Sequence, residues 1–487
     1  MVTLVVGAEC YDIMAIVGNG TFGQVIQGQC RSTGDMVAIK ILKNCDHSGQ
    51  IVKNELRLLQ ALREGNTKDS HIVHFLESFS DTVWTYLVFE LLQQNLFDFQ
   101  KQNNFSPLPV RHIRTITAQV LVALVKLKEL SIIHADLKPE NIMLVDHAHY
   151  PFRVKLVDFG SAILLPKVCH VQVPYIQSRF YRAPEILLGL PFCEKVDIWS
   201  LGCVMAELHL GWPLYPGNDE YDQVRYICST LGLPRGKLLC AAQKTQSFFQ
   251  CVPCSTGTWQ LKPPGKVMAK PMERRKHIFS SLDQLAVVNL CPMPNPDQEE
   301  LAKRCDLYGM VELVKRMLTW GSHERITPSA ALHHPFITMQ EVKASFEATH
   351  YYQLSQKDLK AFCKDSSIAK VFLGSKRRQG GIQKATAQMD GLSLAEPAGD
   401  NGDNKHQQDI CQAPSLTQCG SQYCQHDWCP QMEPTDGHLS VLGSPSKMKG
   451  HSHCSSSPAA GGIKEQQLPG RCYSCAKGIS YPTKTYL

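Results

Sequence analysis

HADLKPEN, at residues 134–141, is the stretch of this sequence that decides its fold. Its polar groups suit phosphoryl transfer, which needs metal ions, a positioned acceptor and charge neutralisation more than covalent help from the protein. Asp136 can accept the proton of an acceptor hydroxyl, and Lys138 can reach the terminal phosphate. Asn141 offers an amide oxygen to a metal ion. Taken alone, an Asp close to an Asn is more often part of a turn or a cap.

A second acidic motif, VDFG at residues 157–160, supplies the other half of a metal site. Asp158 and Asn141 carry hard oxygen donors, which suit Mg²⁺ because this ion keeps several waters and bridges to substrate phosphates. We therefore predict that Asn141 and Asp158 hold two Mg²⁺ ions. Asp136, Lys138 and Asn141 are the predicted catalytic residues.

Toward the N-terminus, the glycine-rich stretch GNGTFGQV at residues 18–25 follows a strand-like run at residues 11–17. Glycines let the backbone approach phosphate oxygens and point its N–H groups at them. The G-x-G-x-x-G spacing alone is a weak signal, because dinucleotide-binding loops and chance both produce it. A dinucleotide loop should open a helix. Here a second strand-like run follows instead, which favours a triphosphate loop.

Lys40 ends the motif VAIK at residues 37–40, within the strand-like run at residues 36–42. A lysine on such a strand can neutralise the α- and β-phosphates of a bound triphosphate. Glu55, in the amphipathic run at residues 51–62, is the expected ion-pair partner that holds Lys40 in place. The alternative for Lys40 on this motif alone is a solvated strand lysine.

These motifs occur together and in the order of the eukaryotic protein kinases, which the sequence resembles over residues 11–336. APE at residues 183–185 and DIWS at residues 197–200 extend the likeness. Within that group, YIQSRFYRAPE at residues 175–185 is close to the homeodomain-interacting protein kinases and the related dual-specificity tyrosine-regulated kinases. Ala135, in the catalytic motif, is similar to the former.

The resemblance implies an α+β, bilobal protein kinase fold, with a β-rich N-lobe and an α-rich C-lobe. The β-rich runs near the N-terminus and the helical period of Ile113, Ile116, Val120, Leu124 and Leu127 agree with two lobes. The expected domains follow. They are a kinase domain at 11–340 (N-lobe 11–92, C-lobe 93–340, insert 216–306), an extension at 341–374 and a low-complexity tail at 375–487.

The cofactors that the resemblance implies are ATP and Mg²⁺. Phe89 is then the gatekeeper at the back of the adenine pocket, and the backbone of Glu90 and Leu92 faces the adenine edge. The full set of residues predicted to bind the cofactor is Val17, Gly18, Asn19, Gly20, Thr21, Phe22, Gly23, Gln24, Val25, Lys40, Glu55, Glu90 and Leu92.

Ala135 departs from most kinases, in which an arginine at this position binds a phosphorylated activation segment. Tyr175 is the expected phosphosite, autophosphorylated to raise activity, with Arg179 and Arg182 as the nearby cations. A phosphotyrosine carries about −1.5 to −2 charge, well matched to two guanidinium groups. The alternative for both arginines is substrate contact or packing of the segment. By resemblance, Arg182 also favours Ser or Thr followed by Pro as the acceptor.

Two classes of function compete: an active Ser/Thr kinase with tyrosine autophosphorylation, and a kinase-shaped scaffold without chemistry. The complete set of catalytic groups favours the enzyme, because a scaffold under no catalytic demand would have lost at least one of them. The expected partners are protein substrates, with transcription regulators among the candidates. The chain itself is expected to be a monomer.

Composition and sequence pattern exclude other classes of protein. The net charge of +6 is small for 487 residues, so we do not expect a nucleic-acid-coating role. No run approaches the roughly 18 apolar residues that a membrane span needs. The 20 cysteines, with no secretory signal, point to reduced thiols. The CVPC pair at residues 251–254 and the cysteines of the tail are expected to be free thiols, with an irregular zinc site as the alternative.

Only residues 337–487 follow the region of resemblance, and this shortness favours the cytoplasm, with the nucleus open as an additional location. It also argues against binding to homeodomain proteins. The basic cluster ERRKH at residues 273–277 is either an import signal or an exposed helix face.

Overall fold

A computed structural model describes residues 2–6, 9–19, 23–44, 49–67, 69–165, 175–252, 258–263, 273–290 and 293–363. All of these residues lie in one compact unit, Met1–Gln412 with Lys484–Leu487. The predicted tail at 375–487, Cys254 and residues 20–22 of the glycine-rich stretch lie outside the described residues.

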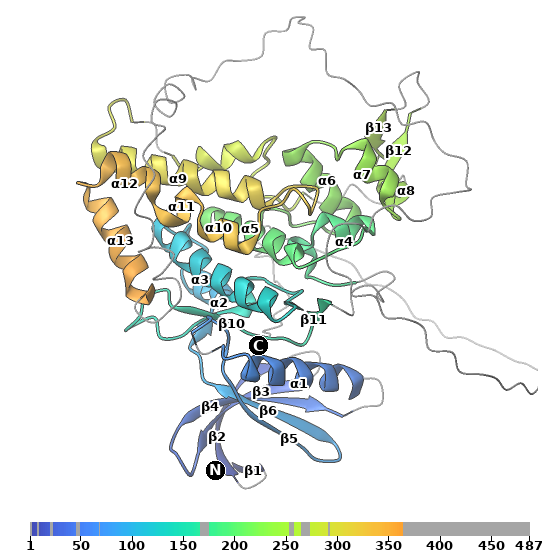
Figure 1. Cartoon of the computed structure of the whole chain (residues 1–487), viewed down its shortest axis with the longest axis vertical. Helices are drawn as coiled ribbons and strands as arrows, with labels where there is room; N and C mark the ends of the chain where they lie inside the picture. Colours follow the sequence, from blue (N-terminus) through green and yellow to red (C-terminus); the bar gives the residue numbers. More distant parts are fainter. Residues whose placement is uncertain are drawn as a thin grey trace, which may run out of the picture. The chain divides into compact units, whose positions relative to one another are not determined.

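The N-terminal lobe is built on a six-stranded antiparallel sheet in the order β1-β2-β3-β4-β6-β5 (Figure 1). Its strands are β1 (Val2–Val6), β2 (Glu9–Asn19), β3 (Gly23–Cys30), β4 (Met36–Lys43), β5 (Phe75–Ser80) and β6 (Trp84–Glu90). The strand predicted at 11–17 is longer than expected, and β1 was not predicted. The apolar run of β1 pairs along its whole length with the start of β2, so the sheet begins before residue 11.

Helix α1 (Gly49–Glu64) is the one helix among the described residues of this lobe. Val52, Leu58, Leu59 and Leu62 recur at helical spacing and are buried, so they form the face that packs into the core. Glu55 lies within this apolar stripe and is only 3% exposed. A carboxylate at such a position requires a partner, because an unpaired buried charge is costly.

The C-terminal lobe is mainly helical (Figure 1). Helix α3 carries the predicted period, and Ile113, Ile116, Val120, Leu124 and Leu127 are all buried. The helices up to residue 210 are α2 (Leu96–Gln102), α3 (Val110–Glu129), α4 (Pro184–Leu188) and α5 (Lys195–Leu210). Those at the end of the lobe are α9 (Gln298–Met317), α10 (Pro328–Leu332) and α11 (Pro335–Thr338).

Short strands and turns between α3 and α4, with one more strand just before α2, surround the predicted catalytic motifs. Strands β7 and β10 flank β9 in one small sheet, and β11 pairs with β8 in another. These elements are β7 (Gln94–Asn95), β8 (Ile132–Ile133), β9 (Ile142–Leu144), β10 (Val154–Leu156), β11 (Ile163–Leu164) and the 3₁₀ turns η1 (Pro139–Asn141) and η3 (Arg179–Tyr181).

The predicted insert at 216–306 contains regular structure rather than a plain connector. Its described elements are α6 (Glu220–Leu231), α7 (Gly236–Ala241), α8 (Thr245–Phe248), the hairpin β12 (Phe249–Cys251) with β13 (Trp259–Leu261), and η4 (Leu282–Ala286). Within the basic cluster, Arg275 donates to Glu273 and lies over the ring of Tyr226, and its side chain is only 9% exposed. This cluster is therefore partly used for packing.

Beyond the kinase core, α12 (Gln340–Phe346) and α13 (His350–Cys363) belong to the predicted extension. The Glu299 carboxylate of α9 accepts the first backbone N–H groups of α13, from His350 and Tyr351. The Tyr351 hydroxyl donates to Asp306, which also accepts from the buried Arg114 of α3. These contacts anchor the extension to the C-lobe.

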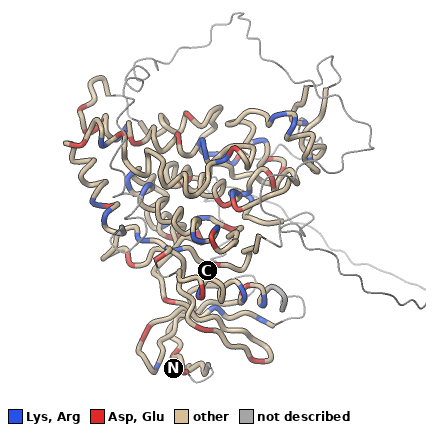
Figure 2. Tube along the Cα trace, viewed as in Figure 1, with Lys and Arg blue, Asp and Glu red and all other residues tan. Residues whose placement is uncertain are grey.

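No helix in the described part of the chain is long and apolar enough to cross a membrane. In the part of the chain that the structure describes, basic and acidic residues are interspersed over both lobes (Figure 2).

Candidate active site

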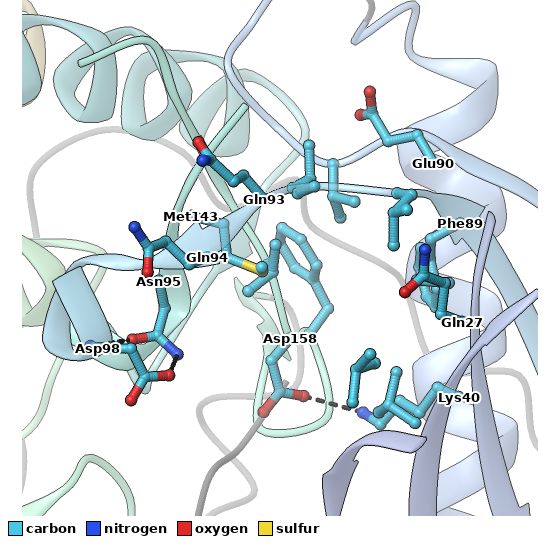
Figure 3. Close-up of a pocket in the computed structure, with 18 of the residues that line it drawn as sticks. Gln27, Lys40, Phe89, Glu90, Gln93, Gln94, Asn95, Asp98, Met143 and Asp158 are labelled. Carbon is cyan, nitrogen blue, oxygen red and sulfur yellow. Dashed lines mark hydrogen bonds and ion pairs between the residues drawn. The ribbon is translucent and has the colours of Figure 1, made fainter. Parts of the chain in front are cut away.

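Lys40 lies at the centre of an ion cluster that joins three elements. Its Nζ is 2.8 Å from Oε1 of Glu55 on α1 and 2.9 Å from Oδ1 of Asp158, which follows β10 (Figure 3). The three side chains are only 16%, 4% and 19% exposed. The lysine is therefore not the solvated strand residue that its motif alone would allow.

The pKa values in this cluster follow from burial and charge. Burial alone would lower the pKa of Lys40, but the carboxylates of Asp158 and Glu55 outweigh it and raise that pKa. Burial alone would raise the pKa of Asp158, but the Lys40 ammonium outweighs it and lowers that pKa. Both groups are thus charged at neutral pH, with the Lys40 ammonium directly beside the Asp158 carboxylate.

Asp197 of α5 fixes the backbone at the start of the catalytic motif. Its buried carboxylate accepts the backbone N–H groups of His134 (2.8 Å) and Ala135 (2.9 Å). Ala135 has φ of 64°, a left-handed conformation that a non-glycine residue adopts only under constraint. His134 bonds the Val157 carbonyl through Nε2 at 3.0 Å, which ties the 134–141 stretch to the strand before Asp158.

Asp136 has both carboxylate oxygens engaged. Oδ1 accepts the backbone N–H (3.0 Å) and the hydroxyl (2.8 Å) of Ser178, and Oδ2 accepts Lys138 Nζ at 2.6 Å. Lys138 Nζ also lies 3.2 Å from the Ser178 hydroxyl. Burial acts to lower the pKa of Lys138, and Asp136 overcomes it, so that pKa is raised. Ser178 was not predicted as a site residue, although it lies in the stretch 175–185 that carries the resemblance.

Asn141 is oriented by Asp136, because its Nδ2 donates to the Asp136 backbone oxygen at 2.8 Å. Its Oδ1 is buried and has no hydrogen-bond partner among the described residues. A buried amide oxygen without a partner is unusual, and a cation would satisfy it. The described residues hold no group of three or more His, Cys, Asp and Glu side chains suited to a metal. An ion at Asn141 and Asp158 would take its other ligands from water and phosphate, as Mg²⁺ commonly does.

A cavity of about 340 Å³ opens beside this cluster, between the N-lobe sheet and the catalytic segments (Figure 3). Of the residues predicted to bind the cofactor, the ones that line it are Val17, Val25, Lys40, Glu55, Glu90 and Leu92. Phe89 and Asp158 also line the cavity. Gly18, Asn19, Gly23 and Gln24 are described but are not among its lining residues. Gly20, Thr21 and Phe22 lie outside the described residues.

The glycine-rich stretch joins β2 to β3, where Gly18 pairs with Val25 and Asn19 with Gln24. Gly23 shows why the first residue of β3 is glycine. A Cβ at this position would lie 1.6 Å from the Ile41 carbonyl oxygen of β4, so any side chain would displace the sheet.

Residues 90–93, at the end of β6, connect the two lobes and form the hinge. The ring of Phe89, just before it, packs on Phe75 with centroids 5.6 Å apart. Among the described residues, no hydrogen bond of Leu92 N–H or C=O is present, so both are available to a ligand. Gln93, the next residue, is anchored because its N–H donates to Leu144 at 2.9 Å.

Tyr175 is 75% exposed, and its ring lies 4.3 Å from the guanidinium carbon of Arg182. Hydrogen bonding and charge from Arg182 lower the pKa of the Tyr175 phenol. Arg182 is itself buried. It donates to the carbonyls of Ile176 (3.0 Å) and Gln177 (2.9 Å), and its Nη1 lies 3.2 Å from Glu220.

Arg179 donates to the carbonyls of Asn218 (2.6 Å) and Gly217 (3.4 Å), and its buried Nε has no partner among the described residues. Both arginines of the predicted phosphosite therefore donate to neighbouring backbone carbonyls. They also carry charge beside Tyr175. Neither is a free surface cation.

Several residues that line the cavity were not predicted: Gln27, Ala38, Val73, Leu91, Gln93, Gln94, Asn95, Asp98, Met143, Val157 and Phe159. Strand alternation could have found two of them, because side chains two positions apart on a strand share a face. Gln27 lies two positions after Val25, and Ala38 lies two positions before Lys40. The 91–98 group depends on how the chain passes from the hinge to α2. Asn95 caps this helix by accepting the Asp98 N–H at 2.8 Å.

The fold and site define a protein kinase. The family described as Protein kinase domain matches residues 11–337. The chain therefore belongs to the protein kinase family.

Within that family, the curated relatives to which the chain is similar include homeodomain-interacting protein kinases, which confirms the resemblance. Homeodomain-interacting protein kinase 4 of Mus musculus is 61% identical over 365 residues, covering 73% of this chain and 59% of that protein. Homeodomain-interacting protein kinase 2 of Mesocricetus auratus is 49% identical over 346 residues, covering 70% of this chain and 29% of that protein. The aligned part thus spans little more than half of the first relative.

Proposed function

We propose that the protein transfers the γ-phosphate of ATP to Ser and Thr hydroxyls of protein substrates. The observation that carries this proposal is the Lys40 cluster, in which one charged lysine bridges Glu55 and Asp158 at 2.8 and 2.9 Å beside the cavity. Such a cluster can fix nucleotide phosphates beside the catalytic motif. The likeness to homeodomain-interacting protein kinases supports a protein as the acceptor.

The residues divide the work as follows. Lys40 neutralises the phosphates, and Asp136 orients the acceptor hydroxyl and accepts its proton. Lys138, paired with Asp136, lies where it can neutralise the transferred group. Ser178 holds the Asp136 carboxylate until an acceptor hydroxyl takes its place. Asn141 and Asp158 would hold Mg²⁺, which when bound neutralises developing charge on the phosphates.

ATP turnover with a generic basic protein tests this function against that of a scaffold without chemistry. We expect the purified chain to release ADP in a manner that depends on the protein acceptor and to modify its Ser and Thr residues. A chain that binds ATP but releases no ADP would support the scaffold.

Selectivity for Pro after the acceptor forms part of the proposal. Arg182 donates to the Ile176 and Gln177 carbonyls, so each already accepts one hydrogen bond and is a weaker acceptor for the backbone N–H of a bound substrate. Pro lacks that N–H and loses nothing. An N–H left unpaired costs about 1–3 kcal/mol, so a Ser-Pro peptide should show kcat/KM about tenfold above the matched Ser-Ala peptide. Equal values for the two peptides would remove this idea.

Autophosphorylation of Tyr175 is proposed to raise activity. The exposed ring over Arg182 and the unpartnered Nε of Arg179 support it, since a phosphate there would gain charge-assisted hydrogen bonds. Tyr175→Phe keeps the ring and removes only the phosphate site. We expect it to lower kcat/KM several-fold with an unchanged melting temperature.

Mass spectrometry of protein made in bacteria checks the source of the phosphate. Wild type should carry it on Tyr175, whereas Asp136→Asn should not. Phosphate on Tyr175 of the Asp136→Asn protein would implicate another enzyme, and an unmodified Tyr175 in fully active wild type would refute the mechanism.

The remaining proposals concern context. We propose a monomer. We also propose that its substrates include transcription regulators, a class suggested by the names of its homeodomain-interacting relatives. We place it in the cytoplasm and also in the nucleus. Fractionation of cells expressing the full chain would test the location.

A further inference from the structure

Glu90 ends strand β6 at the hinge, and its carboxylate is not used by the cavity that its backbone lines. Figure 3 shows this carboxylate pointing away from the cavity. Its two oxygens lie 2.5 and 2.7 Å from Lys155 Nζ, and Oε1 also accepts the backbone N–H of His74 at 2.6 Å. The Glu90 N–H in turn donates to the His74 carbonyl at 3.1 Å. These contacts therefore fix the hinge on the side that faces away from the cavity.

Lys155 belongs to β10, the strand that leads directly into Asp158 three residues later. The same strand is bonded to the segment before β5. Leu156 N–H donates to the His71 carbonyl at 2.8 Å, and Val73 N–H donates to the Leu156 carbonyl at 2.9 Å. The Glu90–Lys155 pair therefore completes a closed set of contacts between the hinge, the 71–74 segment and the strand before Asp158.

We propose that Lys155 is a positioning residue for ATP that acts through Glu90. Their ion pair fixes the distance between the hinge, where the adenine would lie, and Asp158, beside which the phosphates would lie. This inference rests on the proposed function, because it assigns those two places to the two ends of ATP.

Geometry and burial favour this role over that of a surface ion pair. The side chains of Lys155 and Glu90 are only 14% and 27% exposed, and the pair joins segments 65 residues apart in the chain. A charge-assisted pair with both carboxylate oxygens engaged is more directional than a single contact. Without it, ATP must order the hinge itself on binding, and its affinity falls.

Lys155→Met tests the proposal in the full chain, since it removes the charge and keeps the apolar stem. We expect the Kd of a fluorescent ATP analogue and the KM for ATP to rise about three- to tenfold. The kcat at saturating ATP should stay within about twofold of wild type, because Lys40, Asp136 and Asp158 are untouched. A purely structural role would lower the melting temperature without this split between KM and kcat.

Two further variants locate the effect. In Glu90→Gln/Lys155→Met, the rise in Kd should match that of the larger single variant rather than the product of both, because each residue acts through the other. Lys128→Met is the matched control. Lys128 pairs with Glu194 at 2.8 Å within the C-lobe, remote from the hinge contacts, so its Kd and KM should equal those of wild type.

The outcomes separate this inference from the proposed function. A Kd unchanged in Lys155→Met overturns the inference even if the enzyme is active. A rise in kcat with unchanged KM also overturns it, because the pair would then restrain the enzyme instead of positioning ATP. A wild type that binds the analogue but transfers no phosphate refutes the proposed function, and the Kd of Lys155→Met still decides the inference.

Discussion

Asp136→Asn protein is expected to transfer phosphate about 10²- to 10⁴-fold more slowly than wild type, the range that a positioned general base contributes. The substitution keeps the size of the side chain and its contacts with Ser178, whose N–H and hydroxyl can still donate to the amide oxygen. It removes the capacity to take a proton from the acceptor. The measurement is the initial rate at saturating ATP and peptide.

Nucleotide affinity should be largely retained in Asp136→Asn, because Lys40 and the cavity are unaltered. Asp358→Asn is a matched control, since Asp358 of α13 pairs with Arg111 of α3 and does not line the cavity. Its rate should equal that of wild type. A rate of Asp136→Asn within about threefold of wild type would show that Asp136 is not the base.

Asp158→Asn is expected to lower the rate by about 10³-fold or more, because metal-assisted charge stabilisation supplies several kcal/mol. The variant should stay folded, since Lys40 keeps its bond to Glu55. Lys40→Met should be equally inactive and also less stable. It strips the buried Glu55 of the one partner it has among the described residues, and breaking a buried pair costs about 3–5 kcal/mol.

Steady-state rates and thermal melting measure the two effects separately. Lys43→Met is the control for both, because Lys43 is exposed on the same strand β4. Asp158→Asn protein with a rate within about tenfold of wild type would contradict the assigned role of this carboxylate.

Local motifs carried most of what the sequence could predict. The strands at 11–17 and 36–42, the helix at 51–62 and the pair of Lys40 with Glu55 all follow from short patterns, and the structure contains them. They were accessible because strand and helix periods place side chains on one face without reference to the rest of the chain.

Contacts between distant segments could not be derived in this way. Nothing near Glu90 in the sequence indicates Lys155, and nothing near Arg182 indicates that two backbone carbonyls and Glu220 occupy its guanidinium. The prediction gave Arg182 as a cation near Tyr175, with packing of the segment as the alternative, but its burial and its bonds to the Ile176 and Gln177 carbonyls depend on the fold. Tertiary placement, not residue type, decides such roles.

The most direct test of the central claim is transfer of label from γ-labelled ATP to a Ser-Pro peptide, with wild type and Asp136→Asn assayed side by side in the presence of Mg²⁺. The account predicts labelled phosphoserine with wild type and a rate about 10²-fold or more lower with Asp136→Asn. Equal labelling by both proteins, or none by a wild type that binds ATP, would contradict it.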